Sequence, residues 1–203
     1  MSSRRLLLYG GLAVWLAIIV GAFALIWRYK ETPGALPSAP AMWPHGSALE
    51  RAVDRPTLVF IAHPQCPCTR ASINELARLA DELNGRARIH VVVVRPPDTE
   101  PGFEDGPVID RARELPGVRV FVDVDGREAE RFGAAVSGST VVYARDGSLQ
   151  FRGGLTTARG HEGRGPAHDR ILAIAAGTPP DRPDAPVLGC AIYEVTTRSE
   201  VRP

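Results

Sequence analysis

Residues 57–69 read TLVFIAHPQCPCT, and the rest of the chain is best interpreted outward from this stretch. The run Thr57–His63 is short, apolar and rich in β-branched residues, which is typical of a buried strand. The following segment, Arg70–Leu83, has apolar residues at helical spacing. A strand therefore gives way to a helix where the chain carries two cysteines, Cys66 and Cys68.

A thiolate is stabilised at such a junction, because first-turn N–H groups and the helix dipole favour negative charge. Pro67 lacks an N–H group and has a fixed φ, which suits the start of a helix. Ser72 and Glu75 have the spacing of a capping box, which would start the regular helix slightly later and leave Cys68 on its lead-in. The sequence predicts sulfur atoms close to the amino end of this helix.

Strand and helix patterns alternate along the rest of the folded part. The expected strands are Thr57–His63, Ile89–Val94, Val118–Val122, Thr140–Ala144 and Leu149–Phe151. The expected helices are Arg70–Leu83, Pro107–Leu115, Glu128–Gly133 and Ala167–Ala176. This order, with a closing hairpin at Asp146-Gly147, predicts an α/β fold with a mixed central sheet and helices on both faces. Ligands of such sheets bind at the carboxyl ends of strands, where the two cysteines lie.

The stretch Leu6–Trp27 carries no charged residue. As a helix it spans about 33 Å, enough to cross a hydrocarbon core of about 30 Å. It is longer than the apolar region of a cleaved signal peptide, which runs about 7–15 residues. We expect one transmembrane anchor, with residues 1–5 in the cytoplasm. The flanking positive charges nearly balance, but a short charged N-terminus before a long domain favours a bacterial inner-membrane protein with its domain in the periplasm.

Proline-rich segments flank the folded part. Residues 28–48 are expected to form a semi-stiff spacer between the membrane and the domain. The domain itself is expected over residues 49–177. Residues 178–203 form a second proline-rich segment, a C-terminal tail that carries the third cysteine, Cys190.

Composition excludes several classes of function. The formal net charge is +1, and the basic residues are scattered among acidic ones, which argues against nucleic-acid binding. Three cysteines are too few for a disulfide-built scaffold, and 44% hydrophobic residues are too many for a disordered chain. The sequence contains neither a G-x-G-x-x-G nor a P-loop pattern, so no organic cofactor is expected.

Cys66 and Cys68 are separated by one residue, so a disulfide between them closes a very small ring. A strained disulfide is readily reduced, which suits transient exchange better than permanent bracing. The simplest alternative is an inert pair or a local surface staple. Two thiolates near a histidine also favour soft ions such as Cu(I), and the candidate copper ligands are then Cys66, Cys68 and His161.

The strand, the Cys-Pro-Cys elbow and the stretch 120–154 (VFVDVDGREAERFGAAVSGSTVVYARDGSLQFRGG) resemble the thioredoxin superfamily. The resemblance is strongest to membrane-anchored bacterial thiol–disulfide proteins of the TlpA/ResA type, and the elbow and the late Gly-Cys also resemble the RedB-like group. It covers about Thr57 to Gly177. It implies a thioredoxin-like fold and exchange with protein thiols or disulfides.

The chain departs from this family at two places. Relatives carry Cys-x-x-Cys, and an ungapped alignment puts Gln65 at the nucleophile position and Cys68 at the resolving position. An alignment gap instead makes Cys66 the nucleophile, which we favour because it is the first thiol on the elbow. Ser139, just before Thr140, stands where relatives carry a cis-proline facing the cysteines. The usual backbone clamp on a substrate peptide is then in doubt, and the loss of proline bulk favours metal binding.

Three more residues are candidate members of the site. His63 could lower a thiol pKa as an imidazolium, bind a metal when neutral, or simply bond to the backbone at the strand end. His161 lies in the glycine-rich polar loop 153–163, either as a site member or as a solvated residue. Cys190 could resolve a disulfide with either elbow thiol, complete a three-thiolate metal site, or be buried.

The sequence thus predicts a membrane-anchored, extracytoplasmic thiol–disulfide oxidoreductase. Cys66 attacks as a thiolate, and Cys68 resolves the mixed disulfide. A Cu(I)-binding, metallochaperone-like protein and a non-catalytic binding domain are the alternatives.

Overall fold

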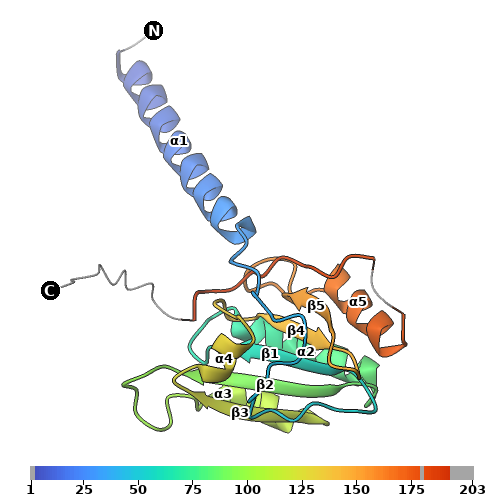
Figure 1. Ribbon diagram of the computed structural model, residues 1–203. Helices are drawn as coiled ribbons and strands as arrows, with labels where there is room; N and C mark the ends of the chain where they lie inside the picture. The colour runs from blue at the N-terminus through green and yellow to red at the C-terminus, as the bar shows by residue number, and fades with distance from the viewer. Residues whose placement is uncertain (1–2, 179–180, 193–203) are drawn as a thin grey trace, which may run out of the picture. The chain divides into compact units, whose positions relative to one another are not determined.

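The computed structural model describes residues 3–178 and 181–192, with side chains from residue 7 onward. The chain divides into two compact units, residues 1–32 and 33–203. The first unit is one helix, α1 (Ser3–Glu31) (Figure 1). Within its span Leu7–Glu31, an 18-residue window has a mean hydropathy of 2.2 and contains no buried residue. By length and composition this helix can cross a membrane, in agreement with the sequence-based expectation for Leu6–Trp27.

The second unit is built on a five-stranded sheet with the strand order β3-β2-β1-β4-β5 (Figure 1). The strands are β1 (Thr57–Ala62), β2 (Arg88–Arg95), β3 (Val118–Val124), β4 (Thr140–Tyr143) and β5 (Leu149–Gly153). The first three strands are parallel, β4 runs antiparallel to β1, and β5 runs antiparallel to β4. The predicted mixed sheet is therefore confirmed, with strand ends within a few residues of those expected.

Helices cover both faces of the sheet. They are α2 (Thr69–Leu83), α3 (Pro107–Glu114), α4 (Arg127–Arg131) and α5 (Pro166–Ala175). One core cluster joins the sheet to α2, α3 and α5, and a second joins its other face to α4. The sequence predicted all four of these helices.

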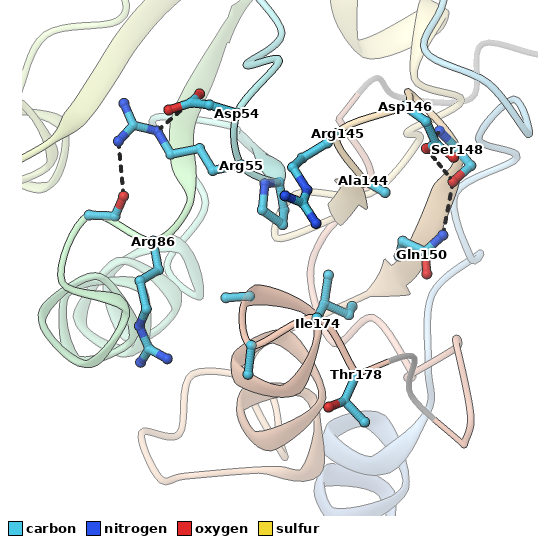
Figure 2. A pocket seen from close by; sticks show the side chains of 15 residues that line it. Asp54, Arg55, Arg86, Ala144, Arg145, Asp146, Ser148, Gln150, Ile174 and Thr178 are labelled. Carbon is cyan, nitrogen blue, oxygen red and sulfur yellow. Dashed lines mark hydrogen bonds and ion pairs between the residues drawn. The ribbon is translucent and has the colours of Figure 1, made fainter.

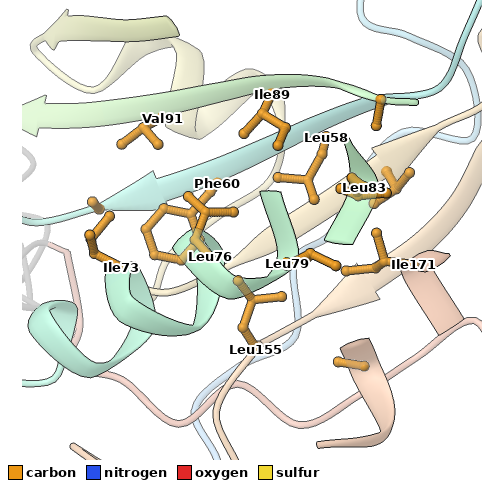
Figure 3. Close-up of a cluster of buried hydrophobic side chains, with 14 of the residues drawn as sticks. Leu58, Phe60, Ile73, Leu76, Leu79, Leu83, Ile89, Val91, Leu155 and Ile171 are labelled. Carbon is orange, nitrogen blue, oxygen red and sulfur yellow. The ribbon is translucent and has the colours of Figure 1, made fainter. Parts of the chain in front are cut away.

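The central strand β1 is apolar throughout because it is buried on both faces. Leu58 and Phe60 point into the cluster beneath α2, where Figure 3 shows Phe60 beside Leu76 and Leu58 nearer to Leu83. Val59 and Ile61 point into the cluster on the opposite face. Side chains alternate between the two faces of a strand, so a strand between two helical layers needs a continuous apolar run. This burial holds the end of β1, and the elbow after it, in a rigid position.

The proline-rich segment after α1 is not the spacer that the sequence predicted over residues 28–48. From Pro33 onward it belongs to the folded unit. Ser38 N–H donates to Gly133 O (2.8 Å), and the Trp43 ring makes edge-to-face contacts with Phe132 and Tyr143 at centroid distances of 5.1 and 5.3 Å. The prolines exclude helix and central strand, but the aromatic and backbone contacts fix the segment as an ordered strap.

The other proline-rich segment also lies against the sheet, beside β5. Arg152 N–H donates to Pro183 O (2.9 Å), and Ala185 N–H donates to Arg152 O (3.0 Å). The Arg152 guanidinium forms two hydrogen bonds with the Asp184 carboxylate, of 2.9 and 3.1 Å. Val187 is fully buried. We call residues 183–192 the docked segment.

Candidate active site

The cysteine elbow consists of two consecutive turns between β1 and α2. Cys66 N–H donates to His63 O (3.1 Å), and Thr69 N–H donates to Cys66 O (3.0 Å). Cys68 is the N-cap residue of α2, with φ −74° and ψ −21°. The elbow thus places both thiols at the amino end of the helix, where the sequence predicted them.

The capping box expected from Ser72 and Glu75 does not form. Ser72 lies inside α2, where its hydroxyl donates to Cys68 O (3.3 Å). Glu75 is buried, and its carboxylate accepts a hydrogen bond from Gly163 N–H (2.6 Å) and contacts Arg78. The turn closed by the hydrogen bond from Thr69 N–H to Cys66 O leads directly into the first turn of α2, so the helix begins at Thr69.

Three thiols meet at the elbow. The sulfur atoms of Cys66, Cys68 and Cys190 all lie within 4.8 Å of one another, and all three cysteines are free. Cys190 comes from the docked segment, more than a hundred residues along the chain. Cys66 is only 6% exposed, whereas the other two are half-buried. The first thiol of the elbow is therefore covered by the surrounding protein.

The pKa of the Cys66 thiol is lowered from its ordinary value. Burial opposes ionisation of this thiol, but hydrogen bonds to its sulfur outweigh burial. The main donors are the backbone N–H and thiol of Cys190 and the backbone N–H of Cys68. Cys66 is thus the thiol of the cluster that ionises most readily.

The pKa values of the other two thiols are shifted in the opposite direction. Burial, and then the negative charge of Cys66, raise the pKa of Cys68. Burial, and then its hydrogen bond and charge repulsion with Cys66, raise the pKa of Cys190 to about 11. The positive charge of Arg159 opposes both increases. Ionisation is therefore favoured at Cys66 and disfavoured at Cys68 and Cys190.

The Ser137 hydroxyl ties the elbow to the loop before β4. It accepts a hydrogen bond from His63 N–H (2.9 Å) and bonds to the Thr69 hydroxyl at 3.1 Å. The Thr69 hydroxyl also donates to His63 O (2.9 Å). Ser137 and Thr69 are buried, so this small network fixes the end of β1 against the start of α2.

The docked segment pairs with the same loop. Ser137 N–H donates to Cys190 O (2.8 Å), and Ile192 N–H donates to Ala135 O (2.9 Å). At Gly189 the two backbones approach so closely that a Cβ atom would overlap the Ser137 carbonyl. Arg159 donates a hydrogen bond from its guanidinium to Gly189 O. These contacts position Cys190 through its own backbone, on the loop that also braces the elbow.

His63 lies at the end of β1, where its ring contacts Phe103 edge to face at 5.7 Å. Burial lowers its pKa, so the neutral form is favoured. A neutral ring cannot stabilise a thiolate by charge. The main-chain N–H and carbonyl of His63 bond to Ser137 and Thr69, and within the described residues its ring does not belong to the group of neighbouring metal-ligating side chains.

Ser139 and Thr140 lie at the start of β4. Ser139 O accepts a hydrogen bond from Ile61 N–H (2.8 Å), and its peptide bond is trans. The buried Ser139 hydroxyl has no hydrogen-bond partner within the described part of the chain. The Thr140 hydroxyl donates to Gly138 O (3.3 Å). Both residues are therefore held in the sheet beside β1.

The remaining candidates lie on the surface. Gln65 and Pro67 are exposed on the elbow. His161 is exposed in its loop, with its Nδ1 atom 3.1 Å from Arg159 O. Within residues 3–178 and 181–192, the side chains that lie close enough together to bind a metal ion are those of the three cysteines. His161 does not belong to this group.

Sequence reasoning missed three residues that shape this site: Thr69, Ser137 and Arg159. Thr69 directly follows the second cysteine, and Ser137 lies in the turn singled out for Ser139. Arg159 lies two residues before His161, in the loop expected to carry function. The available signals for these residues were the hydroxyls next to the cysteine elbow and the cation in a loop near the strand ends.

The cavity shown in Figure 2 lies far from these thiols, at the opposite end of the sheet. It has a volume of about 650 Å³ and is lined by residues that precede β1, follow β4 or end α5, including Asp54, Arg145 and Thr178. Its lining contains neither cysteine nor histidine. The thiols of the elbow therefore lie outside this cavity.

The fold and the elbow together define a thioredoxin-fold protein. An uncharacterised conserved protein from Geobacillus kaustophilus is similar, with a TM-score of 0.62 and 18% identity over 81% of this chain and 98% of that one. A hypothetical protein from Sinorhizobium meliloti has the same TM-score and identity, over 77% and 96%. A putative thioredoxin from Neisseria meningitidis is more distant, with a TM-score of 0.45 and 17% identity over 72% and 89%.

No known protein family matches the chain by sequence, and no curated protein does either. The similarity to solved structures is one of fold.

Proposed function

We propose that this protein is a thiol–disulfide oxidoreductase in which Cys66 is the nucleophile. The observation that carries the proposal is the set of hydrogen bonds to the Cys66 sulfur, which lowers the pKa of this thiol despite its burial. A thiolate is the form that attacks a disulfide, and catalytic thiols of this chemistry have lowered pKa values.

The reaction starts with attack of the Cys66 thiolate on one sulfur of a partner protein's disulfide. A bond forms between Cys66 and that sulfur, and the other partner sulfur leaves as a thiolate that takes up a proton. A second thiol of the cluster then attacks the mixed disulfide and releases the first partner sulfur. Two electrons pass to the partner, and two protein thiols become a disulfide. The sequence assigns this second step to Cys68.

The helix α1 supports a membrane-anchored form of this activity, related to the TlpA/ResA type. We place the domain in the periplasm of a bacterial inner membrane, where disulfides form and persist. Its partners there are protein thiols and disulfides, and the exchange itself needs no cofactor. Nucleic acid is not a partner in this proposal.

The test uses the full chain in detergent micelles, reduced and then mixed with a protein that carries an accessible disulfide. We expect the wild type to reduce this disulfide and Cys66→Ser to lose the reaction. Ala191→Ser, at an exposed neighbour of Cys190, is the matched control and retains wild-type rates. Equal rates for Cys66→Ser and wild type would reject the oxidoreductase and favour a non-catalytic binding domain.

Copper binding is the second candidate, favoured by the approach of three sulfur atoms within 4.8 Å. Three thiolates suit a soft ion such as Cu(I), so Cys66, Cys68 and Cys190 are the proposed ligands. Titration of the full chain with Cu(I) against a competing chelator tests this site. We expect loss of retained copper in Cys190→Ser and no loss in His161→Ala. Retention by both variants would contradict the three-thiolate site.

A further inference from the structure

We propose that Cys190, carried by the docked segment, is the thiol that resolves the mixed disulfide on Cys66, so that the oxidised protein holds a Cys66–Cys190 disulfide. The inference rests on the proposed oxidoreductase function, and it assigns the second step of the exchange to Cys190 in place of Cys68. It follows from the backbone contacts of the docked segment, the close approach at Gly189 and the geometry of the elbow.

The docked segment aims Cys190 at Cys66 through contacts on both sides of the thiol. Cys190 O accepts from Ser137 N–H (2.8 Å), and two residues later Ile192 N–H donates to Ala135 O (2.9 Å). The residues on either side, Leu188 and Ile192, are buried. The backbone N–H and the thiol of Cys190 both hydrogen-bond to the Cys66 sulfur. The two sulfur atoms are therefore neighbours before any bond forms.

Gly189 makes this approach possible. A Cβ atom there would overlap the Ser137 carbonyl, which is backbone and cannot rotate aside. The chain thus has a residue without a side chain directly before the cysteine, at the point of closest approach. Any larger residue must move the segment, and Cys190 with it, away from the elbow.

Cys68 is poorly suited to bond with Cys66. The two cysteines flank Pro67, whose ring fixes φ, and a disulfide across one residue closes a strained ring. Cys68 is also the N-cap residue of α2, and its carbonyl accepts from Ser72 N–H (3.2 Å). Its backbone cannot turn toward Cys66 without disturbing the first turn of the helix. Cys190 lies on a separate segment and has no such constraint.

The same segment also explains why the nucleophile is covered. Cys66 is 6% exposed in the reduced protein, with Cys190 directly beside its sulfur. Attack on a partner disulfide then requires the segment to move aside. Its return brings the Cys190 thiolate, after loss of its proton to solvent, to the Cys66 sulfur. The Cys66–Cys190 bond forms, and the partner's remaining sulfur leaves as a thiolate that is protonated.

Disulfide mapping tests the pairing directly. The reduced full chain is oxidised with diamide in detergent, its free thiols are alkylated, and it is digested with trypsin without reduction. Trypsin leaves Cys66 and Cys68 together in peptide 52–70, and Cys190 in peptide 171–198, because Arg-Pro bonds resist cleavage. We expect the two peptides joined as the main product, with fragment ions placing the alkyl group on Cys68 and the link on Cys66. A link on Cys68, a peptide 52–70 that is two hydrogens lighter, or three alkylated cysteines would overturn the inference.

Two variants test whether the yield of the disulfide depends on the position of the Cys190 thiol as well as on its presence. Gly189→Ala retains all three thiols but displaces Cys190, and we expect several-fold less of the joined peptides than in the wild type. Ala191→Ser, two residues away and exposed, is the control and gives the wild-type yield. Equal yields in Gly189→Ala and wild type would contradict the positioning by Gly189.

Trapping the intermediate separates this inference from the proposed function. With a disulfide-bonded test peptide, Cys190→Ser is expected to accumulate a mixed disulfide on Cys66, whereas Cys68→Ser does not accumulate one. Accumulation in Cys68→Ser instead of Cys190→Ser would show that Cys68 resolves, and the inference would fail while the oxidoreductase stands. If no variant, wild type included, forms a mixed disulfide, the oxidoreductase fails, and the mapping alone decides the pairing.

Discussion

The two ends of the central sheet differ in what they contain. At the carboxyl end of β1, three thiols and two buried hydroxyls are packed closely together. At the opposite end lies a cavity of about 650 Å³ whose lining is rich in charged side chains but contains no thiol or imidazole. Large pockets are the usual first place to look for a site. Here the hydrogen bonds that lower the pKa of the Cys66 thiol lie at one end of the sheet, and this cavity lies at the other.

The largest expected effect is at the thiol end. Replacing Cys66 by serine removes the nucleophile, and thiol-exchange activity is expected to fall by at least about 10³-fold. Stopped-flow reduction of a protein disulfide measures the change, with Ala191→Ser as the control. A fall of less than tenfold would mean that another thiol attacks the partner.

Substitutions at the two ends of the sheet should also differ in their effect on the free energy of unfolding. Ser137→Ala removes the acceptor of His63 N–H and the partner of the Thr69 hydroxyl, and leaving such buried groups unpaired costs about 1–3 kcal/mol. Ser148→Ala is the matched control, because its hydroxyl donates to Asp146 at an exposed hairpin. Urea unfolding of both variants measures the free energy of unfolding. Equal losses would show that the Ser137 network does not brace the elbow.

The pH dependence of alkylation should separate the thiols of the cluster. Only thiolates react with iodoacetamide, so each cysteine's rate rises with pH and levels off above its pKa. The lowered pKa of Cys66 places its midpoint below that of an ordinary thiol, whereas the midpoint of Cys190 lies near 11. Fragment-ion mass spectrometry assigns the label to each cysteine.

The smallest effect is expected at the cavity end. Arg145 is exposed in the turn between β4 and β5 and lines the cavity. Arg145→Ala should change the free energy of unfolding by no more than about 0.5 kcal/mol, as is usual for surface substitutions. Its thiol-exchange rate should equal that of wild type. A large loss of exchange activity in this variant would link the cavity to the reaction.

Much of the fold could be predicted because its elements are locally encoded. The apolar run of β1, the helical spacing in α2 and the Asp-Gly turn before β5 each reflect a periodicity or a turn preference that needs no tertiary contact. The elbow was predicted for the same reason, since Cys66 and Cys68 lie between two clear elements. The strap from Pro33 was missed because proline content reports what a segment cannot form, and says nothing of what Trp43 contacts.

The third thiol illustrates the limit for the site. Cys190 was a candidate, but its place beside Cys66 depends on contacts such as Gly189 against Ser137, which join segments about fifty residues apart. A single sequence carries no signal for such a pair. The same holds for Arg159, whose effect on the thiols comes from its position in space. Local chemistry was therefore predictable, whereas the assembly of the cluster was not.

The pairing of the docked segment with Ala135 and Ser137 has a consequence for recognition. Those backbone groups already form hydrogen bonds with the docked segment. A partner polypeptide that pairs with them must therefore displace this segment, which belongs to the same chain. Its apparent dissociation constant equals the intrinsic one divided by the fraction of molecules with the segment released. A substitution that loosens the segment would then tighten partner binding without touching the partner.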